Sequence, residues 1–235
     1  MVTHKHSIIE RKVVNMPVRV GLQYIEKWNS SMEDAVRKYE QEPLEKGQIV
    51  FYGASNFTRW GRGTRWDHKP LREVMLGKSG KPCAVNRGFG SSNAEHQLYY
   101  YPRMVRPLEP KVLVYHPFGN YRGFGYSLEE VWELAQRVIM YALADFPGIQ
   151  VYISCGLWHV KDNVEEATAL AEKTKALVQE FVANTPNCHL VNVFDHEPLR
   201  DPEIFVEDGV HYNQKGYDLY ADFFKEVLKE ELDRF

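Results

Sequence analysis

The chain has 235 residues, of which 44% are hydrophobic and 26% are charged, and its formal net charge at pH 7 is −3. These values are ordinary for one globular domain, and a slight negative charge gives no reason to expect nucleic acid or an anionic membrane as a partner. Three cysteines without metal-ligand spacing predict buried, reduced thiols and neither a disulfide framework nor a metal site.

The N-terminal segment precedes the first predicted strand. Residues 1–10 carry charge with no apolar stretch behind them, and no part of the chain reaches the length of a membrane span, so we expect a cytoplasmic protein. Residues 22–39 have a helical pattern that ends before Pro43. We therefore expect residues 1–45 to form an extension that packs on a single domain of residues 46–235.

Short apolar, β-branched or aromatic runs alternate with helical patterns along the rest of the chain. These runs, which predict strands, lie at residues 48–52, 83–86, 111–116, 149–154 and 189–194. Helices are predicted after Ser127, which has the glutamate of a capping box at Glu130, after Asn163 and after Asn213. Such alternation is typical of an α/β domain with a mainly parallel sheet covered on both faces.

Several chemically useful residues lie where predicted strands end. Ser55, Ser91, Asn120, Trp158 and Asp208 all come just after a strand or in the loop that follows one. In a parallel sheet, ligands bind beyond the carboxyl ends of the strands. We therefore expect these residues to gather at one site.

Two short motifs carry the groups needed for nucleophilic catalysis. Ser55 lies in a small-residue turn directly behind the first predicted strand, where its hydroxyl would be exposed. Asp208 stands three residues before His211, and among the nine histidines only His211 has an aspartate at that spacing. Together they offer a nucleophile, a general base and an orienting acid for acyl transfer.

In this order the motifs resemble the SGNH hydrolases, the GDSL-like esterase and lipase family, from about residue 47 to the C-terminus. The matching segments are residues 51–56, 86–92, 115–121 and 208–211. In the first of them Ala54 stands where many members have aspartate. The resemblance implies a three-layer α/β/α sandwich with a flavodoxin-like, mainly parallel five-stranded sheet. It also implies ester hydrolysis through an acyl-serine, with no cofactor and no metal.

The resemblance assigns the catalytic roles. Ser55 would be the nucleophile, His211 its general base, and Asp208 the group that fixes the imidazole. Each residue also has a plain structural alternative: Ser55 could cap the helix that follows the strand, and Asp208 could belong to a surface turn beside a solvated His211.

An oxyanion hole is implied by the same resemblance. It would use the backbone N–H of Ser55, a backbone N–H of the second segment at Gly90 or Ser91, and the side-chain amide of Asn120. Two features depart from the family pattern, because Ser91 occupies a position usually held by glycine and the residue after Asn120 is not aspartate. Gly90 could serve only to let the chain bend, and Asn120 could serve only to satisfy loop backbone groups.

Arginine and tryptophan residues crowd positions 59–68, and another tryptophan follows a later strand. Aromatic rings stack on sugar faces and arginine binds carboxylates or phosphates, so Arg59, Trp60 and Trp158 are predicted substrate-binding residues. The alternative is that the arginines are solvated or paired with acids and the tryptophans cover an edge of the core.

Taken together, the sequence predicts a serine esterase that removes a short acyl group, acetyl first of all, from a polar alcohol such as a carbohydrate. The short-acyl expectation rests on Ser91 in the oxyanion segment and on few apolar residues in the candidate pocket loops. Two alternatives stay open: a binding or scaffold protein that has kept the fold without turnover, and an acyltransferase that uses the same triad. A homo-oligomer is also compatible with the sequence.

Overall fold

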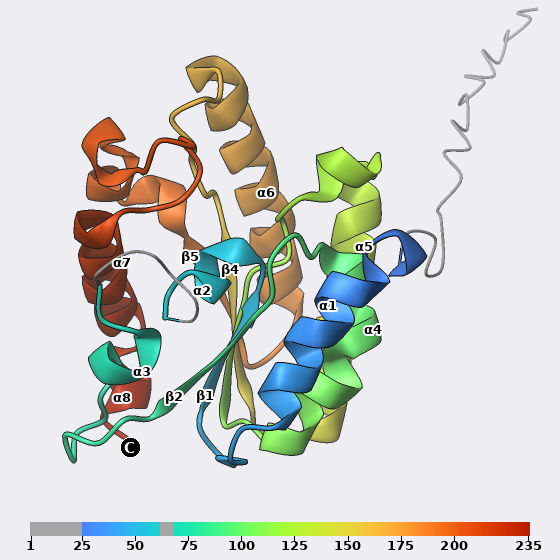
Figure 1. Ribbon diagram of the computed structural model, residues 1–235, viewed down its shortest axis with the longest axis vertical. Helices are drawn as coiled ribbons and strands as arrows, with labels where there is room; N and C mark the ends of the chain where they lie inside the picture. Colours follow the sequence, from blue (N-terminus) through green and yellow to red (C-terminus); the bar gives the residue numbers. More distant parts are fainter. Residues whose placement is uncertain (1–24, 62–67) are drawn as a thin grey trace, which may run out of the picture.

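Five parallel strands form one sheet in the order β2-β1-β3-β4-β5 (Figure 1). The structure is a computed structural model that describes residues 25–61 and 68–235. The strands are β1 (Ile49–Gly53), β2 (Ala84–Gly88), β3 (Val112–Tyr115), β4 (Gln150–Cys155) and β5 (Cys188–Asn192). All five predicted strands are present, with ends shifted by one or two residues, and the sheet is flavodoxin-like as expected.

Burial explains why the central strands have continuous apolar sequences. Every residue of β1 and β3 is buried, because helices cover both faces of the sheet. Side chains alternate between the faces, so Tyr52 and Leu113 enter one core while Phe51 and Val114 enter the other. Edge strand β5 is buried at only some of its positions, which fits its mixed sequence.

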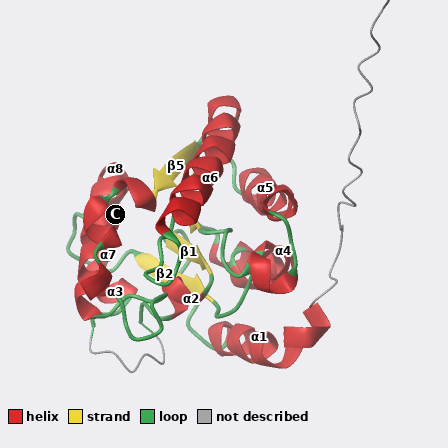
Figure 2. Ribbon diagram, turned by 90° about the horizontal axis from the view of Figure 1, so that it is seen from above, coloured by secondary structure: helices red, strands yellow, loops and turns green. Residues whose placement is uncertain are grey.

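Helices form the outer layers (Figure 2). They are α1 (Ile25–Glu40), α2 (Ser55–Thr58), α3 (Leu71–Val74), α4 (Ala94–Met104), α5 (Leu128–Asp145), α6 (Val164–Asn184), α7 (Gln214–Val227) and α8 (Lys229–Leu232). One core is formed by the sheet with α1, α4, α5 and α6, and the other by the sheet with α2, α3, α7 and α8. This is the three-layer α/β/α sandwich that the sequence predicts.

The predicted helix starts are confirmed by their caps. Ser127 and Glu130 form a complete capping box at the start of α5. Asn163 accepts hydrogen bonds from two backbone N–H groups at the start of α6, and Asn213 accepts one from Gly216 at the start of α7. These side chains satisfy backbone donors that have no partner within a helix.

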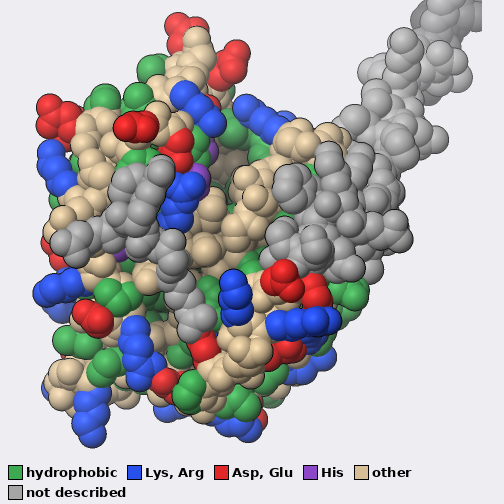
Figure 3. All heavy atoms as spheres, in the orientation of Figure 1, with side chains coloured by type: hydrophobic (Ala, Val, Ile, Leu, Met, Phe, Trp, Pro, Cys, Tyr) green, Lys and Arg blue, Asp and Glu red, His purple; other side chains and the backbone are tan. Residues whose placement is uncertain are grey.

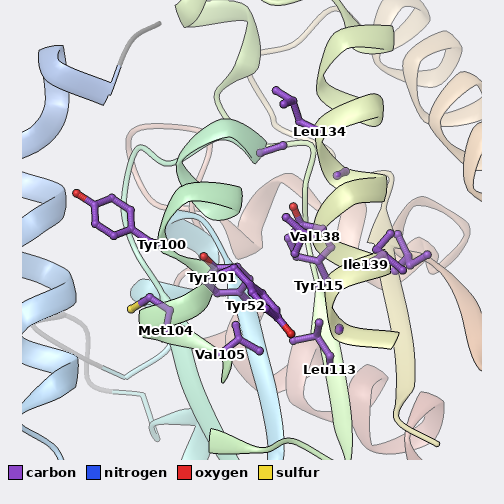
Figure 4. Close-up of a cluster of buried hydrophobic side chains, with 14 of the residues drawn as sticks. Tyr52, Tyr100, Tyr101, Met104, Val105, Leu113, Tyr115, Leu134, Val138 and Ile139 are labelled. Carbon is purple, nitrogen blue, oxygen red and sulfur yellow. The ribbon is translucent and has the colours of Figure 1, made fainter. Parts of the chain in front are cut away.

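Aromatic residues fill much of the core between the sheet and α4 and α5 (Figure 4). The rings of Tyr52 and Tyr115 stack on neighbouring strands with centroids 5.9 Å apart. Tyr52 is fully buried, and its hydroxyl donates to the carbonyl of Gln97 at 2.6 Å. Tyr52 thus buries a large apolar area while its polar end stays hydrogen-bonded.

Helix α1 packs on α4. Arg103 of α4 donates two hydrogen bonds to Glu33 of α1, at 2.8 and 2.9 Å, and two to Glu40, at 2.7 and 2.8 Å. The hydrogen bonds from Arg103 lower the pKa of Glu33 to about 2. Residues 1–24 lie outside the described part, so the rest of the predicted extension and its boundary at residue 45 stay predictions.

The three cysteines are buried, as predicted, and all three are free. Burial raises the pKa of the Cys83 and Cys188 thiols to about 11 and that of Cys155 to about 12. Within residues 25–61 and 68–235, no helix has both the length and the apolar character that crossing a bilayer requires.

Candidate active site

Ser55 lies at the carboxyl end of β1, an inner strand of the sheet. The strand ends at Gly53, the chain turns at Ala54, and Ser55 opens α2. A side chain on Gly53 would place a Cβ 2.9 Å from the Phe57 ring, so only glycine lets the helix fold back this closely. The nucleophile candidate is therefore presented on a sharp strand–helix turn.

Side chains from distant parts of the chain hold α2 in place. Asn86 of β2 donates to the carbonyl oxygens of Phe57 at 2.6 Å and Trp60 at 3.2 Å. The hydroxyl of Tyr217 donates to the carbonyl of Asn56 at 2.8 Å. A four-residue helix is too short to be stable alone, and these contacts supply the partners that its own backbone lacks.

Ser55, His211 and Asp208 form a continuous hydrogen-bonded chain. The Ser55 hydroxyl lies 2.8 Å from Nε2 of His211, and Nδ1 of His211 lies 2.7 Å from Oδ2 of Asp208. Ser55 does not cap its helix, because Ala54 holds the N-cap position without a side-chain bond. The structure thus brings the three predicted catalytic side chains together across 156 residues of sequence.

The turn from Asp208 to His211 orients the acid. Oδ1 of Asp208 accepts hydrogen bonds from the backbone N–H groups of Val210 and His211, both at 2.9 Å. Gly209, directly after Asp208, adopts φ 63°, a conformation that side chains disfavour. The surface turn offered as an alternative is therefore present, and it is this turn that aims the second carboxylate oxygen at the imidazole.

The local charges suit a general base. Partial burial opposes ionisation of Asp208, but hydrogen bonds from the backbone N–H groups of His211 and Val210 hold its pKa well below the usual range. Burial lowers the pKa of His211 below 6.5, and the nearby Arg59 also lowers it, while Asp208 acts in the opposite direction. At neutral pH the imidazole is neutral and its Nε2 can accept the serine proton.

The loops after β2 and β3 meet the turn that carries Ser55. The backbone N–H of Phe89 donates to the carbonyl of Gly53 at 3.0 Å, and Nδ2 of Asn120 donates to the carbonyl of Ser92 at 2.9 Å. A Cβ on Gly119 would lie 3.0 Å from the Ala54 side chain. These contacts bring the candidate oxyanion segments beside the nucleophile turn.

The predicted oxyanion residues have distinctive backbone conformations. Asn120 and Ser91 adopt φ values of 58° and 60°, and both residues are exposed. The Asn120 amide has a second hydrogen that its bond to Ser92 does not use. Neighbouring Gly90 has open space where a side chain would start. The roles of Gly90, Ser91 and Asn120 in an oxyanion hole stay predictions.

A cavity of about 180 Å³ opens beside Asn120. The loops after β3 and β4 and one face of α6 form it, with apolar walls that include Phe118, Tyr121, Leu157 and Leu170. Figure 3 shows this face hollowed, with histidine side chains at the edge of the hollow. The expectation that the pocket loops are poor in apolar residues is wrong for this cavity, because Phe118, Tyr121 and Leu157 belong to those loops and α6 adds Leu170. Ser91 is not among its lining residues.

A second aspartate–histidine pair borders this cavity, and the sequence motifs do not single it out. Nδ1 of His159 lies 3.1 Å from Oδ2 of Asp162, and both residues line the cavity. Burial lowers the pKa of His159, while Asp162 opposes that effect. The signal in the sequence is an aspartate three residues after a histidine, the reverse of the order in the triad.

Two of the three predicted substrate-binding residues have other partners. Trp60 is only 1% exposed and packs its ring against Phe51, Tyr220 and Phe224, so its prediction as a stacking platform for substrate is wrong. Arg59 forms an ion pair with Oδ2 of Asp208 at 3.1 Å, which is the pairing with an acid that the sequence left open, and its role in substrate binding stays a prediction.

Trp158 remains a candidate for substrate binding. It is partly exposed and packs edge-on against Phe205, with ring centroids 5.4 Å apart, but it does not line the cavity. The other arginine and tryptophan residues of the cluster, at positions 62–66, lie outside the described residues.

Comparisons with known proteins identify the fold. No family profile matches the chain, and no curated protein matches it in sequence. Among solved structures, a GDSL-like lipase from Bacteroides thetaiotaomicron superposes with a TM-score of 0.58 at 17% identity, covering 88% of this chain and 97% of the other. A family 3 carbohydrate esterase from Clostridium thermocellum gives 0.60 at 13% identity, covering 80% and 98%.

A catalytic mutant of an acetylxylan esterase from Geobacillus stearothermophilus gives a TM-score of 0.61 at 12% identity, covering 79% of this chain and 95% of the other. These matches extend over most of the chain. The chain therefore has the SGNH hydrolase fold, as the sequence predicts.

Proposed function

We propose that this chain is a serine ester hydrolase whose triad is Ser55, His211 and Asp208. The observation that carries the proposal is the unbroken chain of hydrogen bonds, at 2.8 and 2.7 Å, from the Ser55 hydroxyl through the imidazole to the carboxylate. This hydrogen-bonded chain lies at the carboxyl edge of the sheet, where ligands of such folds bind. A neutral imidazole and an ionised carboxylate are the protonation states that the reaction needs.

The geometry leads to a two-step reaction. Nε2 of His211 takes the Ser55 proton as the hydroxyl oxygen attacks the ester carbonyl, and Asp208 stabilises the imidazolium that forms. The negative charge on the carbonyl oxygen would be met by the Asn120 amide and backbone N–H groups of the neighbouring turns. His211 then protonates the leaving alcohol, and water, activated by the same imidazole, hydrolyses the acyl-serine.

The proposed substrate is a short-chain ester of a polar alcohol. The cavity beside Asn120 holds about 180 Å³. That volume corresponds to about six water molecules at about 30 Å³ each, and a methylene group is of similar size. Its apolar walls favour an acyl group, and its size favours a short one. Two of the structures with this fold are named as carbohydrate esterases, which supports acetylated sugars as the first substrates to test.

Replacement of the nucleophile tests the proposal. The Ser55→Ala variant should hydrolyse an aryl acetate about 10⁴–10⁶ times more slowly than the wild type, because no other group can form the acyl intermediate. Ser127→Ala is a matched control, since Ser127 caps α5 and takes no part in the triad. Equal rates for Ser55→Ala and the wild type would contradict the proposal, and a wild type without turnover would leave a binding protein with this fold. Product analysis with an added alcohol would separate hydrolysis from acyl transfer.

A further inference from the structure

Arg59 connects the two ends of the triad. It follows α2, one helical turn after Ser55, and its backbone N–H donates to the carbonyl of Ser55 at 2.8 Å. Its guanidinium donates from Nη1 to Oδ2 of Asp208 at 3.1 Å. One residue therefore bonds both to the nucleophile's backbone and to the carboxylate that orients the base.

The backbone of Arg59 is itself anchored. Nε2 of His68 lies 2.8 Å from the Arg59 carbonyl oxygen, and the His68 ring stacks on Tyr217 with centroids 4.4 Å apart. The Arg59 side chain is about one-third exposed. The backbone of Arg59 is thus held on both sides of its Cα, while its charge lies where water only partly screens it.

Arg59 and His211 share one oxygen of Asp208. Oδ2 accepts from both Nδ1 of His211 and Nη1 of Arg59, while Oδ1 accepts from two backbone N–H groups. The guanidinium helps to hold the carboxylate in place and ionised. It also puts a permanent positive charge near the imidazole, which makes a second positive charge there less favourable.

Other charged groups besides Arg59 lie near the imidazole. Three charged or titratable groups act on His211: Asp208 in its own turn, Arg59 after α2, and His159 in the loop after β4. His159 is in turn affected by Asp162 and Lys161 of the same loop. Of the three groups, Asp208 favours the imidazolium, whereas Arg59 and His159 oppose it. Of these two opposing groups, Arg59 is the one that also bonds to the carboxylate of Asp208.

We propose that Arg59 is a positioning residue that acts on the reaction through Asp208 and extends the enzyme's activity toward lower pH. The inference rests on the proposed esterase function. Without the guanidinium, Asp208 would interact with the imidazolium alone, and His211 would become protonated at higher pH. Activity, which needs the neutral imidazole, would then be lost earlier as the pH falls.

The test compares charge-removing and charge-keeping variants. In Arg59→Gln, the acid-side decline of kcat/KM for an aryl acetate should occur at a pH about half a unit higher than in the wild type. The kcat of this variant at neutral pH should be about two- to fivefold lower. Arg59→Lys keeps the positive charge, so its acid limb should stay near that of the wild type. Arg137→Gln is the matched control, because Arg137 forms an ion pair with Glu133 on α5 and has no contact with the triad.

The outcomes separate this inference from the proposed function. An acid limb of Arg59→Gln that stays in place or moves to lower pH would overturn the role of Arg59, whatever happens to kcat. If Arg59→Gln fails to fold, Arg59→Met keeps an unbranched stem without the charge, and the same shift is expected. Activity that persists in Ser55→Ala would instead overturn the function itself, independently of any effect at Arg59.

Discussion

A serine in a strand–helix turn has two common uses, and the local geometry decides between them. In a cap, the hydroxyl accepts a backbone N–H two or three residues ahead. At Ser55 the hydroxyl instead lies 2.8 Å from an imidazole contributed by a turn near the C-terminus. Residue type and spacing identify the candidates, but only the fold shows which partner the hydroxyl meets.

Asn120 allows a test at the level of a single residue. We expect Asn120→Ala to lower kcat about 10²–10³-fold with a small change in KM, because an oxyanion donor stabilises the transition state more than the bound ester. Steady-state kinetics with an aryl acetate measure both constants. Asn184→Ala serves as the control, since Asn184 lies at the end of α6 and bonds only to a carbonyl of that helix. An unchanged kcat would exclude Asn120 from the oxyanion hole.

At the level of elements, the sequence predicts the strands and helices that are marked by their own residues, through apolar runs or capping side chains. Apolar runs indicate the buried strands, and capping residues such as Ser127 and Asn163 indicate the long helices. Trp60 shows where such patterns fail. Its ring enters a core built with α7, more than 150 residues later, and nothing in the adjacent sequence distinguishes a core tryptophan from one that binds a sugar.

The short helix α2 depends on close packing against β2, and glycine makes that packing possible. A Cβ on Gly88 would lie 2.6 Å from Cβ of Phe57 and closer still to the backbone nitrogen of Thr58. Gly88→Ala should therefore displace α2, lower the free energy of unfolding by about 1–3 kcal/mol and reduce esterase activity.

Thermal or denaturant unfolding measures the first effect and turnover of an aryl acetate the second. Gly123→Ala is the control for stability, because a side chain there meets open space. Equal stability of Gly88→Ala and the wild type would show that α2 is not held as tightly as the contacts indicate.

At the scale of the whole molecule, the site lies where the segments that follow all five strands converge with one face of α6. The contribution of α6 could not be predicted from the motifs, because which face of a helix borders a cavity depends on how the helix packs on the sheet. The pairing of Arg59 with Asp208 could not be predicted either, since the two residues are 149 positions apart. The triad and the fold class, by contrast, follow from short motifs in a recognisable order.

Cavity size sets the expected acyl preference of the molecule. Turnover should fall from acetyl to octanoyl esters, because an octanoyl chain exceeds a cavity of about 180 Å³. Leu170→Ala removes an apolar wall and should raise the rate on butyryl and hexanoyl esters relative to acetyl. Leu177→Ala is the matched control: it lies on the same helix and packs on the same core without lining the cavity. An identical chain-length profile for both variants would place the acyl group elsewhere.

The most direct measurement of the central claim is covalent labelling by a fluorophosphonate, followed by mass spectrometry of the modified peptide. The account predicts one adduct on Ser55 in the wild type, because the neutral imidazole 2.8 Å away activates that hydroxyl, and strongly slowed labelling in His211→Ala. An unmodified Ser55, or labelling that is equally fast without His211, would contradict it.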